Sequence, residues 1–396
     1  MSVRIFHIIP TLGRGGAERQ LVNLVCNMDR ARYEHIVCYL QPPDDFAAEM
    51  AQAGLTVIGL NVRQKRPWLT APAKLLPHLR THRPDIIQTW LFEADVSARL
   101  THLLGNTIPI INTLHLTSYE PETIRAANWP AWKMSGLRWI DKLTTKLARP
   151  TFTACSYTVK ASAQRYLSID DDRIRVIYNS IDPETLRCAP GAPRRLREEL
   201  QLPADAFVYL NVGRLAAQKG QEYLLRAFRQ VATTIPKAYL VVVGDGPAAA
   251  ELKQLCIHLN LDARVRFTGR RSDVGACLEL ADVFVFPSLF EGHPLAPIEA
   301  MMKGLPCIAS RIDASLEVIE EQKTGLLVTP GAVDELAAAM LRLHHDPALR
   351  RSLAAQGQQM ALQRFHSRTG MRAWEDLYRE LMQPAQRLGS AAEQQL

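Results

Sequence analysis

Short apolar runs alternate along the chain with longer segments in which apolar residues recur every three or four positions. The run Val3–Ile9 predicts a buried strand, and Leu21, Leu24, Val25 and Met28 then predict a helix. The predicted strands are 3–9, 36–40, 56–60, 85–89, 108–113, 150–155, 174–178, 206–212, 238–243, 265–268, 283–287, 306–309 and 325–328. The predicted helices are 17–28, 74–81, 221–232, one after 247, one beginning near 297, 334–344, 347–364 and 369–383. Such alternation indicates parallel sheets that helices cover on both faces, an α/β fold.

A stretch rich in proline and glycine divides the chain near residues 179–193, where Asp182-Pro183 and 189–193 break regular structure. A length of 396 residues suits two domains. We predict a first Rossmann-like domain over 1–182, a second over 183–368, a last helix over 369–388, and a frayed tail over 389–396. Two such domains would hold a ligand in the cleft between them, at the carboxyl ends of their strands.

The formal net charge of +7 is concentrated in the first half of the chain. Up to Ser180 there are 22 Lys and Arg against 15 Asp and Glu, whereas from Ile181 onward there are 25 Lys and Arg against 25 Asp and Glu. This asymmetry indicates an anionic partner for the first half, such as membrane lipid, a phosphorylated acceptor or nucleic acid. A solvated basic face explains it equally well.

The cysteines and the N-terminus indicate a reducing compartment. The seven cysteines are odd in number, widely spaced and without a CxxC pair, so we predict buried thiols, neither disulfides nor zinc ligands. The N-terminus begins a strand at once and lacks the apolar core of a signal peptide. No apolar run approaches the ~20 residues of a membrane span. We therefore expect a cytoplasmic protein, with contact to the inner membrane face left open.

Glycines follow the first predicted strand. Gly13, Gly15 and Gly16 lie between this strand and the next helix, where they let the backbone approach a ligand and expose amides that suit phosphate. The segment is not GxGxxG, because Glu18 stands where the third glycine would fall. A tight turn without a ligand is the alternative.

Two cations follow the first strand of the second half. Arg214 and Lys219 lie five residues apart at the end of that strand and can converge on one pyrophosphate, the guanidinium as a fork and the ammonium as a point charge. The alternative is a pair of unrelated surface cations.

The segment 287–301 carries the strongest chemical signal. Glu291 ends a strand, a turn follows, and we predict a helix that begins near Pro297, a residue favoured at the first helical position. Glu299, predicted in the first turn, can accept hydrogen bonds from a vicinal diol such as ribose. A plain connection with both carboxylates solvated is the alternative.

These motifs together resemble glycosyltransferase family 4. The pair Glu291-x7-Glu299 within EGHPLAPIEA stands in the same order and spacing as the family's other motifs. The matching segments are GGAE (15–18), NTLH (112–115), NSID (179–182), GRLAAQKG (213–220), VVGDGP (242–247), FTGRRSDV (267–274) and 286–310. The resemblance implies a GT-B fold, two Rossmann-like domains facing each other across a cleft, with the C-terminal helix crossing back onto the first domain. It also implies a retaining transferase that uses a nucleotide-sugar, by family habit a UDP-sugar.

The resemblance also implies roles for individual residues. Arg214 and Lys219 would bind the donor diphosphate, Glu299 the ribose, and Glu291 the hydroxyls of the donor sugar. His115 would lie near that sugar. The remaining implied donor-binding positions, mostly through their backbone, are Gly15, Gly16, Gly269, Arg270, Gly292, His293, Leu295 and Ala296.

Three positions depart from the family's pattern. Pro294 stands where many relatives have glycine, and proline has no amide to donate, which suggests altered sugar selection. Ser180 replaces a glycine at the linker. Trp90 stands near a position that often holds histidine; it would line the acceptor side or pack in the core, and we favour the core.

We expect neither a metal nor another cofactor. Transfer from a nucleoside diphosphate requires stabilisation of the departing pyrophosphate, which Arg214, Lys219 and helix amides can supply. The only DxD letters, at Asp170–Asp172, read as a surface loop before a strand. Retention is implied by the family alone, because no residue is marked as a nucleophile.

Two clusters of basic residues with tryptophan suit a lipid headgroup surface. The first holds Arg63, Lys65, Arg66, Trp68, Lys74, Arg80 and Arg83, and the second Trp129, Trp132, Lys133, Arg138, Trp139, Lys142, Lys146 and Arg149. The alternative for the second cluster is an ordinary domain helix whose core-facing stripe is Leu137, Ile140, Leu143, Thr144 and Leu147. We expect a lipid-linked or other glycan acceptor and no nucleic acid, since no nucleic-acid motif accompanies the charge.

Two other functions stay open at this point. A nucleotide-sugar 2-epimerase shares the two-domain plan but needs acid–base groups that we do not identify in the sequence. A non-catalytic sugar-nucleotide-binding subunit is the second, and the four residues Arg214, Lys219, Glu291 and Glu299 speak against it. A phosphorylase and an oxidoreductase lack their cofactor motifs here.

Overall fold

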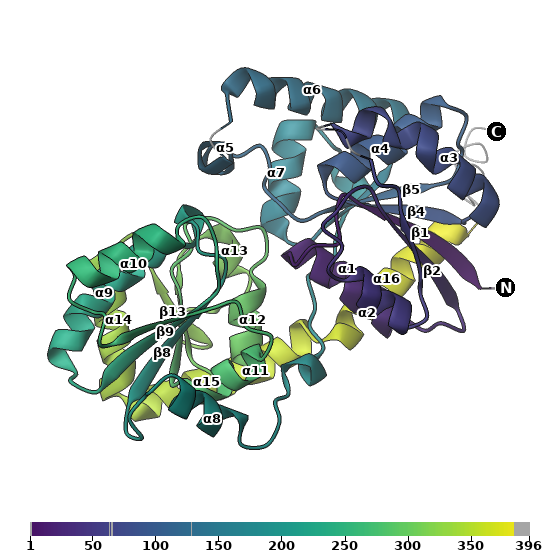
Figure 1. The fold of residues 1–396 in the computed structure, drawn as a ribbon. Helices are drawn as coiled ribbons and strands as arrows, with labels where there is room; N and C mark the ends of the chain where they lie inside the picture. Colours follow the sequence, from purple (N-terminus) through teal and green to yellow (C-terminus); the bar gives the residue numbers. More distant parts are fainter. Residues whose placement is uncertain (1, 63, 65, 128, 384–396) are drawn as a thin grey trace, which may run out of the picture.

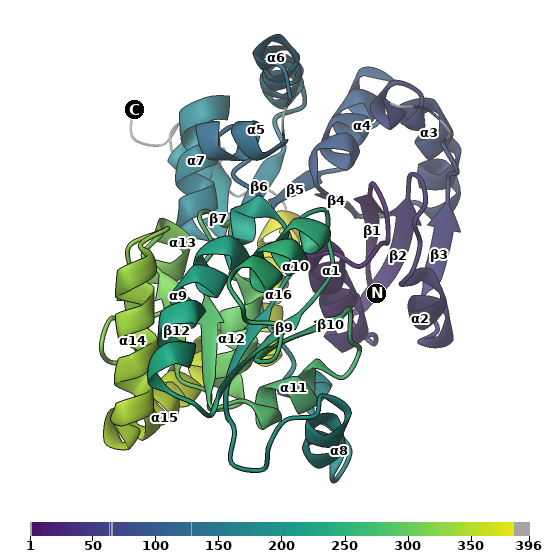
Figure 2. The same ribbon diagram turned by 60° about the vertical axis from the view of Figure 1, so that its left-hand side comes forward.

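The computed structural model of the chain describes residues 2–62, 64, 66–127 and 129–383. It contains two parallel sheets, each flanked by helices, in two lobes (Figures 1 and 2). The seven-stranded sheet has the order β3-β2-β1-β4-β5-β6-β7, and the six-stranded sheet has the order β10-β9-β8-β11-β12-β13. This is the arrangement that the resemblance to GT-B proteins implied.

The first domain is built from residues 3–176 and from the last helix of the chain. Its strands are β1 (Val3–Ile9), β2 (Tyr33–Tyr39), β3 (Thr56–Gly59), β4 (Ile86–Trp90), β5 (Ile110–Leu114), β6 (Thr151–Ala154) and β7 (Ile174–Val176). Its helices are α1 (Gly16–Asn27), α2 (Ala47–Gln52), α3 (Ala71–His82), α4 (Phe92–Leu103), α5 (Pro121–Ala127), α6 (Ala131–Ala148) and α7 (Tyr157–Leu167). Ile5 and Ile9 of β1 pack on the α1 side, whereas Phe6 and Ile8 pack on the α3 and α4 side, as the two-residue repeat of a strand requires.

The second domain repeats the plan. Its strands are β8 (Phe207–Val212), β9 (Ala238–Val243), β10 (Val265–Gly269), β11 (Val283–Phe286), β12 (Cys307–Ser310) and β13 (Gly325–Val328). Its helices are α8 (Ala192–Glu199), α9 (Gln221–Thr234), α10 (Ala249–His258), α11 (Val274–Leu280), α12 (Leu295–Met302), α13 (Asp313–Leu316), α14 (Val333–His345) and α15 (Pro347–Arg364). The apolar runs of the sequence form nearly every strand of both sheets, because a parallel strand buried on both faces is apolar throughout.

The chain crosses between the lobes twice, and the two crossings lie side by side. Ile181 in the first crossing exchanges backbone hydrogen bonds with Phe365 and Ser367 at the start of α16 (Ser367–Met382). The helix α16 then runs back to the first domain (yellow in Figure 1), where Met371 and Trp374 enter its core beside α1. The predicted continuation to residue 388 and the predicted tail 389–396 lie outside the described residues.

None of the helices in the described ranges is long and apolar enough to cross a membrane. All seven cysteines are free thiols, as predicted, and five of them are buried. Asp171 is exposed before β7, as predicted, but it begins the short 3-10 helix Asp171–Arg173 where a loop was expected; its carboxylate accepts a hydrogen bond from Gln164 and pairs with Lys160.

Candidate functional site

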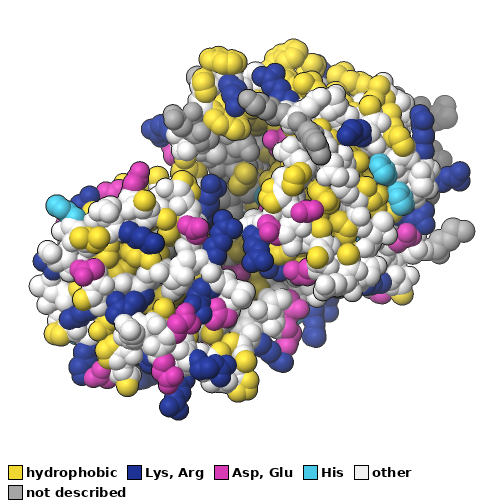
Figure 3. Space-filling model, viewed as in Figure 1, with side chains coloured by type: hydrophobic (Ala, Val, Ile, Leu, Met, Phe, Trp, Pro, Cys, Tyr) yellow, Lys and Arg dark blue, Asp and Glu magenta, His cyan; other side chains and the backbone are white. Residues whose placement is uncertain are grey.

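Strand order brings the predicted motifs to one place. In each sheet the order reverses between two neighbouring central strands, β1 and β4 in the first domain and β8 and β11 in the second. A crevice opens at the carboxyl ends of strands at such a reversal, because the flanking connections leave on opposite faces. The glycine loop follows β1, the Arg214–Gly220 segment follows β8, and the Glu291 turn follows β11. Figure 3 shows Lys and Arg side chains gathered where the two lobes face each other.

The second-domain side of the cleft contains an ion pair. Lys219 Nζ lies 2.5 Å from Glu291 Oε1 and 5.4 Å from the ring centre of Phe286, and both charged side chains are mostly buried. Gln218 joins the same two loops, since its side chain donates to Phe290 O and its own carbonyl accepts from Leu289 N. The loop after β8 and the turn after β11 therefore form one rigid unit.

The turn that follows Glu291 differs from the sequence prediction in one respect. The helix α12 begins at Leu295, two residues before Pro297, so Glu299 lies in its second turn and the prediction of its first turn was wrong. Proline is tolerated at this third helical position because amides of the first turn have no intrahelical acceptor. Glu299 is half-buried; burial raises the pKa of its carboxyl, and Arg19 of the first domain acts in the opposite direction.

His115 meets the Glu291 turn from the first domain. It follows β5, is partly buried, and stacks on Trp90 with ring centres 5.2 Å apart. A Cβ atom on Gly292 would lie 2.3 Å from His115 O, so only glycine allows this approach of the two backbones. Burial lowers the pKa of His115 to about 4, which keeps the imidazole neutral at physiological pH.

The glycine loop also reaches the second domain. Gly15 and Gly16 begin α1, and a Cβ on Gly16 would lie 3.9 Å from Leu295 Cδ1 at the start of α12. The amino ends of α1 and α12 thus approach each other across the cleft, an arrangement that suits an anion between them.

Two family models match the chain in sequence. One, described as "Glycosyltransferase Family 4", matches residues 14–185, and the other, "Glycosyl transferases group 1", matches residues 194–360. A "UDP-Gal:alpha-D-GlcNAc-diphosphoundecaprenol alpha-1,3-galactosyltransferase" of Escherichia coli is 30% identical over 275 residues, which are 68% of this chain and 69% of that protein. The chain belongs to glycosyltransferase family 4.

Another relative and the solved structures agree with this assignment. "Lipopolysaccharide core biosynthesis glycosyltransferase LpsD" of Rhizobium meliloti (strain 1021) is 40% identical over 190 residues, 48% of this chain and 54% of that protein. The structure of Anabaena Alr3699/HepE in complex with UDP and glucose has a TM-score of 0.83 at 23% identity, and the match covers 96% of this chain and 100% of that one. This similarity shows the GT-B fold.

Three other predicted donor positions, Arg214, Gly269 and Arg270, lie at or just after the ends of strands of the second domain. Arg214 and Arg270 are exposed, and Gly269 has a left-handed φ of +70° at the end of β10. Because β10 is the edge strand, Gly269 and Arg270 lie two strands away from β8 and from the Lys219–Glu291 pair.

The structure adds contacts that the sequence reading missed. Ser156, at the start of α7, donates from Oγ to Gly292 O at 2.6 Å, and Asn179 Nδ2 donates to His293 O at 3.3 Å. Glu317 of the second domain accepts hydrogen bonds from the start of α7. Ser156 showed only the signal of a helix cap after a strand, which does not indicate a partner more than a hundred residues away.

His293 and Trp90 are enclosed by aromatic rings. The ring of His293 packs against Tyr178 and Phe365, with centroid distances of 5.1 and 5.4 Å, and burial lowers its pKa to about 3. Trp90 is 1% exposed and contacts His115 and Trp374, so the interpretation as core packing is confirmed.

Proposed function

We propose that this family 4 protein is a retaining, metal-independent glycosyltransferase that moves a sugar from a UDP-sugar to a lipid-linked or lipopolysaccharide-type acceptor. The relatives support the substrate classes, since one is named for UDP-Gal and a diphosphoundecaprenol acceptor and another for lipopolysaccharide core biosynthesis. In this proposal the second domain binds the donor and the first domain receives the acceptor.

The observation that carries the proposal is the Lys219–Glu291 pair at the end of β8 and β11, opposite His115. Glu291 holds the ammonium of Lys219 in one position, so this cation is preorganised before a diphosphate arrives. The exposed guanidinium of Arg214 adds a fork for a second phosphate oxygen. The neutral ring of His115 offers a hydrogen bond to a sugar hydroxyl without adding a second positive charge.

The reaction follows from these positions. The bond between the anomeric carbon and the phosphate oxygen breaks, and its electron pair leaves with UDP, whose new charge Lys219, Arg214 and the amides of the Glu291 turn stabilise. The acceptor oxygen bonds to the same face of that carbon, and its proton passes to the departing phosphate oxygen. This route needs no enzyme nucleophile, and trapping of a covalent glycosyl-enzyme would contradict it.

A donor-hydrolysis screen with purified protein in EDTA tests the proposal. We expect one nucleoside diphosphate to be released from UDP-, GDP- or ADP-sugars, with UDP as the expected product. Removing the charge of Arg214 or Lys219 should lower the rate by about 10²–10³, the usual cost of losing one preorganised transition-state contact. Glu299→Ala should mainly weaken nucleotide binding, because ribose contacts are made in ground state and transition state alike.

Matched controls come from exposed side chains of the same domain. Arg229→Ala on α9 and Glu251→Ala on α10 change the same charges away from the cleft and should leave the rate unchanged. Loss of activity in EDTA would contradict the metal-free mechanism. Conversion of the donor into an isomer that keeps its nucleotide would indicate an epimerase, and nucleotide binding without turnover even with lipid acceptors would indicate a binding subunit.

We further propose that the first domain docks on an anionic membrane through α6, which places the protein on the inner membrane face. Contrary to the alternative of a core-facing stripe, Leu143 and Leu147 are exposed, together with Trp132 at 74% and Trp139 at 65%. Spacings of seven and four residues put these four side chains on one face. Arg138, Lys142 and Lys146 are exposed on the same helix. Figure 3 shows apolar and basic side chains at this end of the molecule.

Such a face combines interfacial aromatic rings with charges that attract anionic lipid. Of the first basic cluster, Arg63 and Lys65 lie outside the described residues, so α6 carries the proposal.

Flotation with vesicles of phosphatidylglycerol should recover the protein, and vesicles of phosphatidylcholine should recover less. Trp132→Ser with Trp139→Ser should abolish recovery, whereas substitution of an exposed apolar residue of the second domain, Ile257→Ser, should not. Recovery that ignores lipid charge and these tryptophans would contradict the proposal.

A further inference from the structure

The start of α7 joins the two domains at the functional site. Ser156 is fully buried, and its hydroxyl has two fixed roles: Oγ accepts from Val159 N at 3.1 Å, and its proton is donated to Gly292 O at 2.6 Å. The first contact caps α7 in the first domain, and the second reaches the turn that carries Glu291 in the second domain. The hydroxyl of Ser156 therefore joins the start of α7 in the first domain to the Glu291 turn in the second domain.

A second contact joins the two domains at the next two residues of the chain, Tyr157 and Thr158. Glu317, which follows α13, accepts from Tyr157 N and Thr158 N, each at 2.8 Å, and from Thr158 Oγ1 at 2.7 Å. A carboxylate at the amino end of a helix is stabilised by the free amides and by the helix dipole. The pKa of Tyr178 is raised mainly by burial and, to a smaller extent, by the negative charge of Glu317. The ring of Tyr178 packs on His293 of the Glu291 turn.

We propose that Ser156 and Glu317 are positioning residues, which hold the Glu291–His293 turn against His115 and thereby set the closed arrangement of the two domains. The close approach of Gly292 to His115 O exists only in this arrangement, because the two residues belong to different domains. Without these contacts the side-by-side crossings at Ile181 and Phe365 remain the main connection, and they can act as a hinge.

Ser156 also acts on the chemistry of the turn. The Gly292 carbonyl and the His293 amide belong to the same peptide unit, so a proton donated to Gly292 O polarises the unit and strengthens His293 N–H as a donor. Pro294 has no amide, which leaves fewer donors in this turn and makes the remaining ones more important. Ser156 therefore supports a donor amide and fixes the position of Glu291 at the same time.

Two measurements test the inference on the full-length protein. In small-angle X-ray scattering, Ser156→Ala and Glu317→Gln should each increase the radius of gyration of the ligand-free protein, and Ser156→Thr, which keeps the hydroxyl, should restore it. Binding of UDP should stay within about twofold of wild type, since the second domain supplies that site. In the transferase assay Ser156→Ala should lower kcat about tenfold with little change in KM for the donor, the effect of losing one hydrogen bond made in the closed state.

The matched control is Glu320→Gln, three residues beyond Glu317, whose carboxylate bonds only to Lys323 of its own domain among the contacts described. It should leave scattering and kcat unchanged. Scattering identical to wild type in both Ser156→Ala and Glu317→Gln would overturn the inference. So would a lower unfolding midpoint of Ser156→Ala with unchanged kcat, which would reduce Ser156 to a helix cap. The kinetic measurement rests on the proposed function; should wild type transfer no sugar, scattering and UDP binding still decide.

Discussion

Two long helices, α6 and α16, cover opposite faces of the first-domain sheet, and they bury different kinds of side chain. The helix α16 buries Met371, Trp374, Leu377 and Tyr378 against α1 and the sheet, and turns its charged residues outward. The helix α6 differs: its buried side contains Asp141, Thr144 and Thr145 besides Met134, and its exposed side contains two tryptophans. The amphipathic pattern of a helix thus tells which side is apolar, but not which side faces the core.

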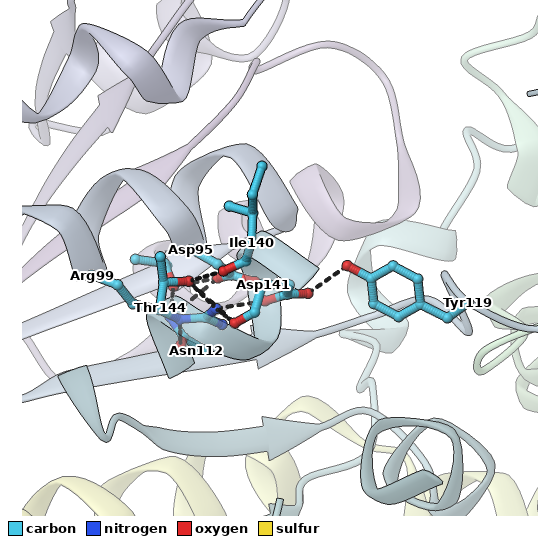
Figure 4. A network of polar contacts seen from close by, with 8 residues as sticks. Asp95, Arg99, Asn112, Tyr119, Ile140, Asp141 and Thr144 are labelled. Atoms are coloured by element: carbon cyan, nitrogen blue, oxygen red, sulfur yellow. Dashed lines mark hydrogen bonds and ion pairs between the residues drawn. The ribbon is translucent and has the colours of Figure 1, made fainter. Parts of the chain in front are cut away.

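A polar network lies under the second half of α6 (Figure 4). Asp141 Oδ1 lies 2.5 Å from Arg99 of α4, Asp141 Oδ2 accepts from Tyr119 Oη at 2.7 Å, and Arg99 Nε donates to Asn112 of β5 at 2.7 Å. Thr89 and Asp95 complete the group. A buried charge pair of this kind stabilises little by itself, but removing one partner is costly because the other charge stays buried.

The sheet itself separates the two environments. Thr89 and Asn112 point to the α6 side, whereas their neighbours Gln88 and Thr113 point to the α16 side and bond to each other at 3.1 Å. Tyr378 of α16 donates to Gln88 there. Since successive residues of a strand alternate between the faces, four adjacent positions serve both helices.

The largest difference in the free energy of unfolding is expected when a tryptophan is replaced by alanine in each of the two helices. Trp374→Ala should lower the free energy of unfolding by about 3–5 kcal/mol, because it opens a cavity in a packed core. Trp132→Ala should change it by no more than about 0.5 kcal/mol, since the ring is exposed. Urea unfolding followed by circular dichroism measures both values, and equal losses would contradict the comparison.

A somewhat smaller effect is expected from the network. Asp141→Ala should cost about 3 kcal/mol, because Arg99 then remains charged and buried without its carboxylate. Asp141→Asn keeps an acceptor for Arg99 and should cost less. The exposed pair of Arg194 and Glu198 provides the control, for which Glu198→Ala should cost about 0.5 kcal/mol or less. An Asp141→Ala protein as stable as this control would refute the role of the network.

The last comparison concerns pH and has opposite signs on the two sides; each unit of pKa shift corresponds to about 1.4 kcal/mol. Burial raises the pKa of Asp95 to about 7, so its contribution to stability is present below about pH 4 and is lost as pH rises towards 7. Burial lowers the pKa of His35 on the α16 side to about 4, so its contribution is present above pH 6.5 and is lost as pH falls towards 4. His35 also contacts His7, 2.8 Å away, which burial holds neutral.

Unfolding measured from pH 4 to 8 separates these contributions. Asp95→Asn should gain stability relative to wild type as pH rises from 4 to 8, and His35→Phe should gain stability relative to wild type as pH falls from 6.5 to 4. Glu49→Gln, an exposed carboxylate on α2, should follow wild type throughout. Parallel curves for all variants would show that neither buried group titrates in this range.

The sequence alone determined the parts of this protein that depend on local pattern. The strands 3–9, 238–243 and 325–328 and the helix 347–364 have the bounds that were predicted, because buried parallel strands and long helices carry strong periodic signals. The cleft motifs were found for a related reason: glycines and charged residues directly after an apolar strand have few structural roles other than at a crevice. Among the cleft elements the start of α12 was misplaced, since proline is accepted at several positions of a first turn.

Only the tertiary structure decided which surfaces meet. It turned Trp132 and Trp139 of α6 outward and paired Asp141 with Arg99 of α4, and no local rule contains that partner. It also brought Ser156 to Gly292 and Glu317 to the start of α7, contacts that join residues 136 and about 160 positions apart. Periodicity is a property of neighbours in sequence, whereas the partner of a buried charge or hydroxyl is set by the packing of whole domains.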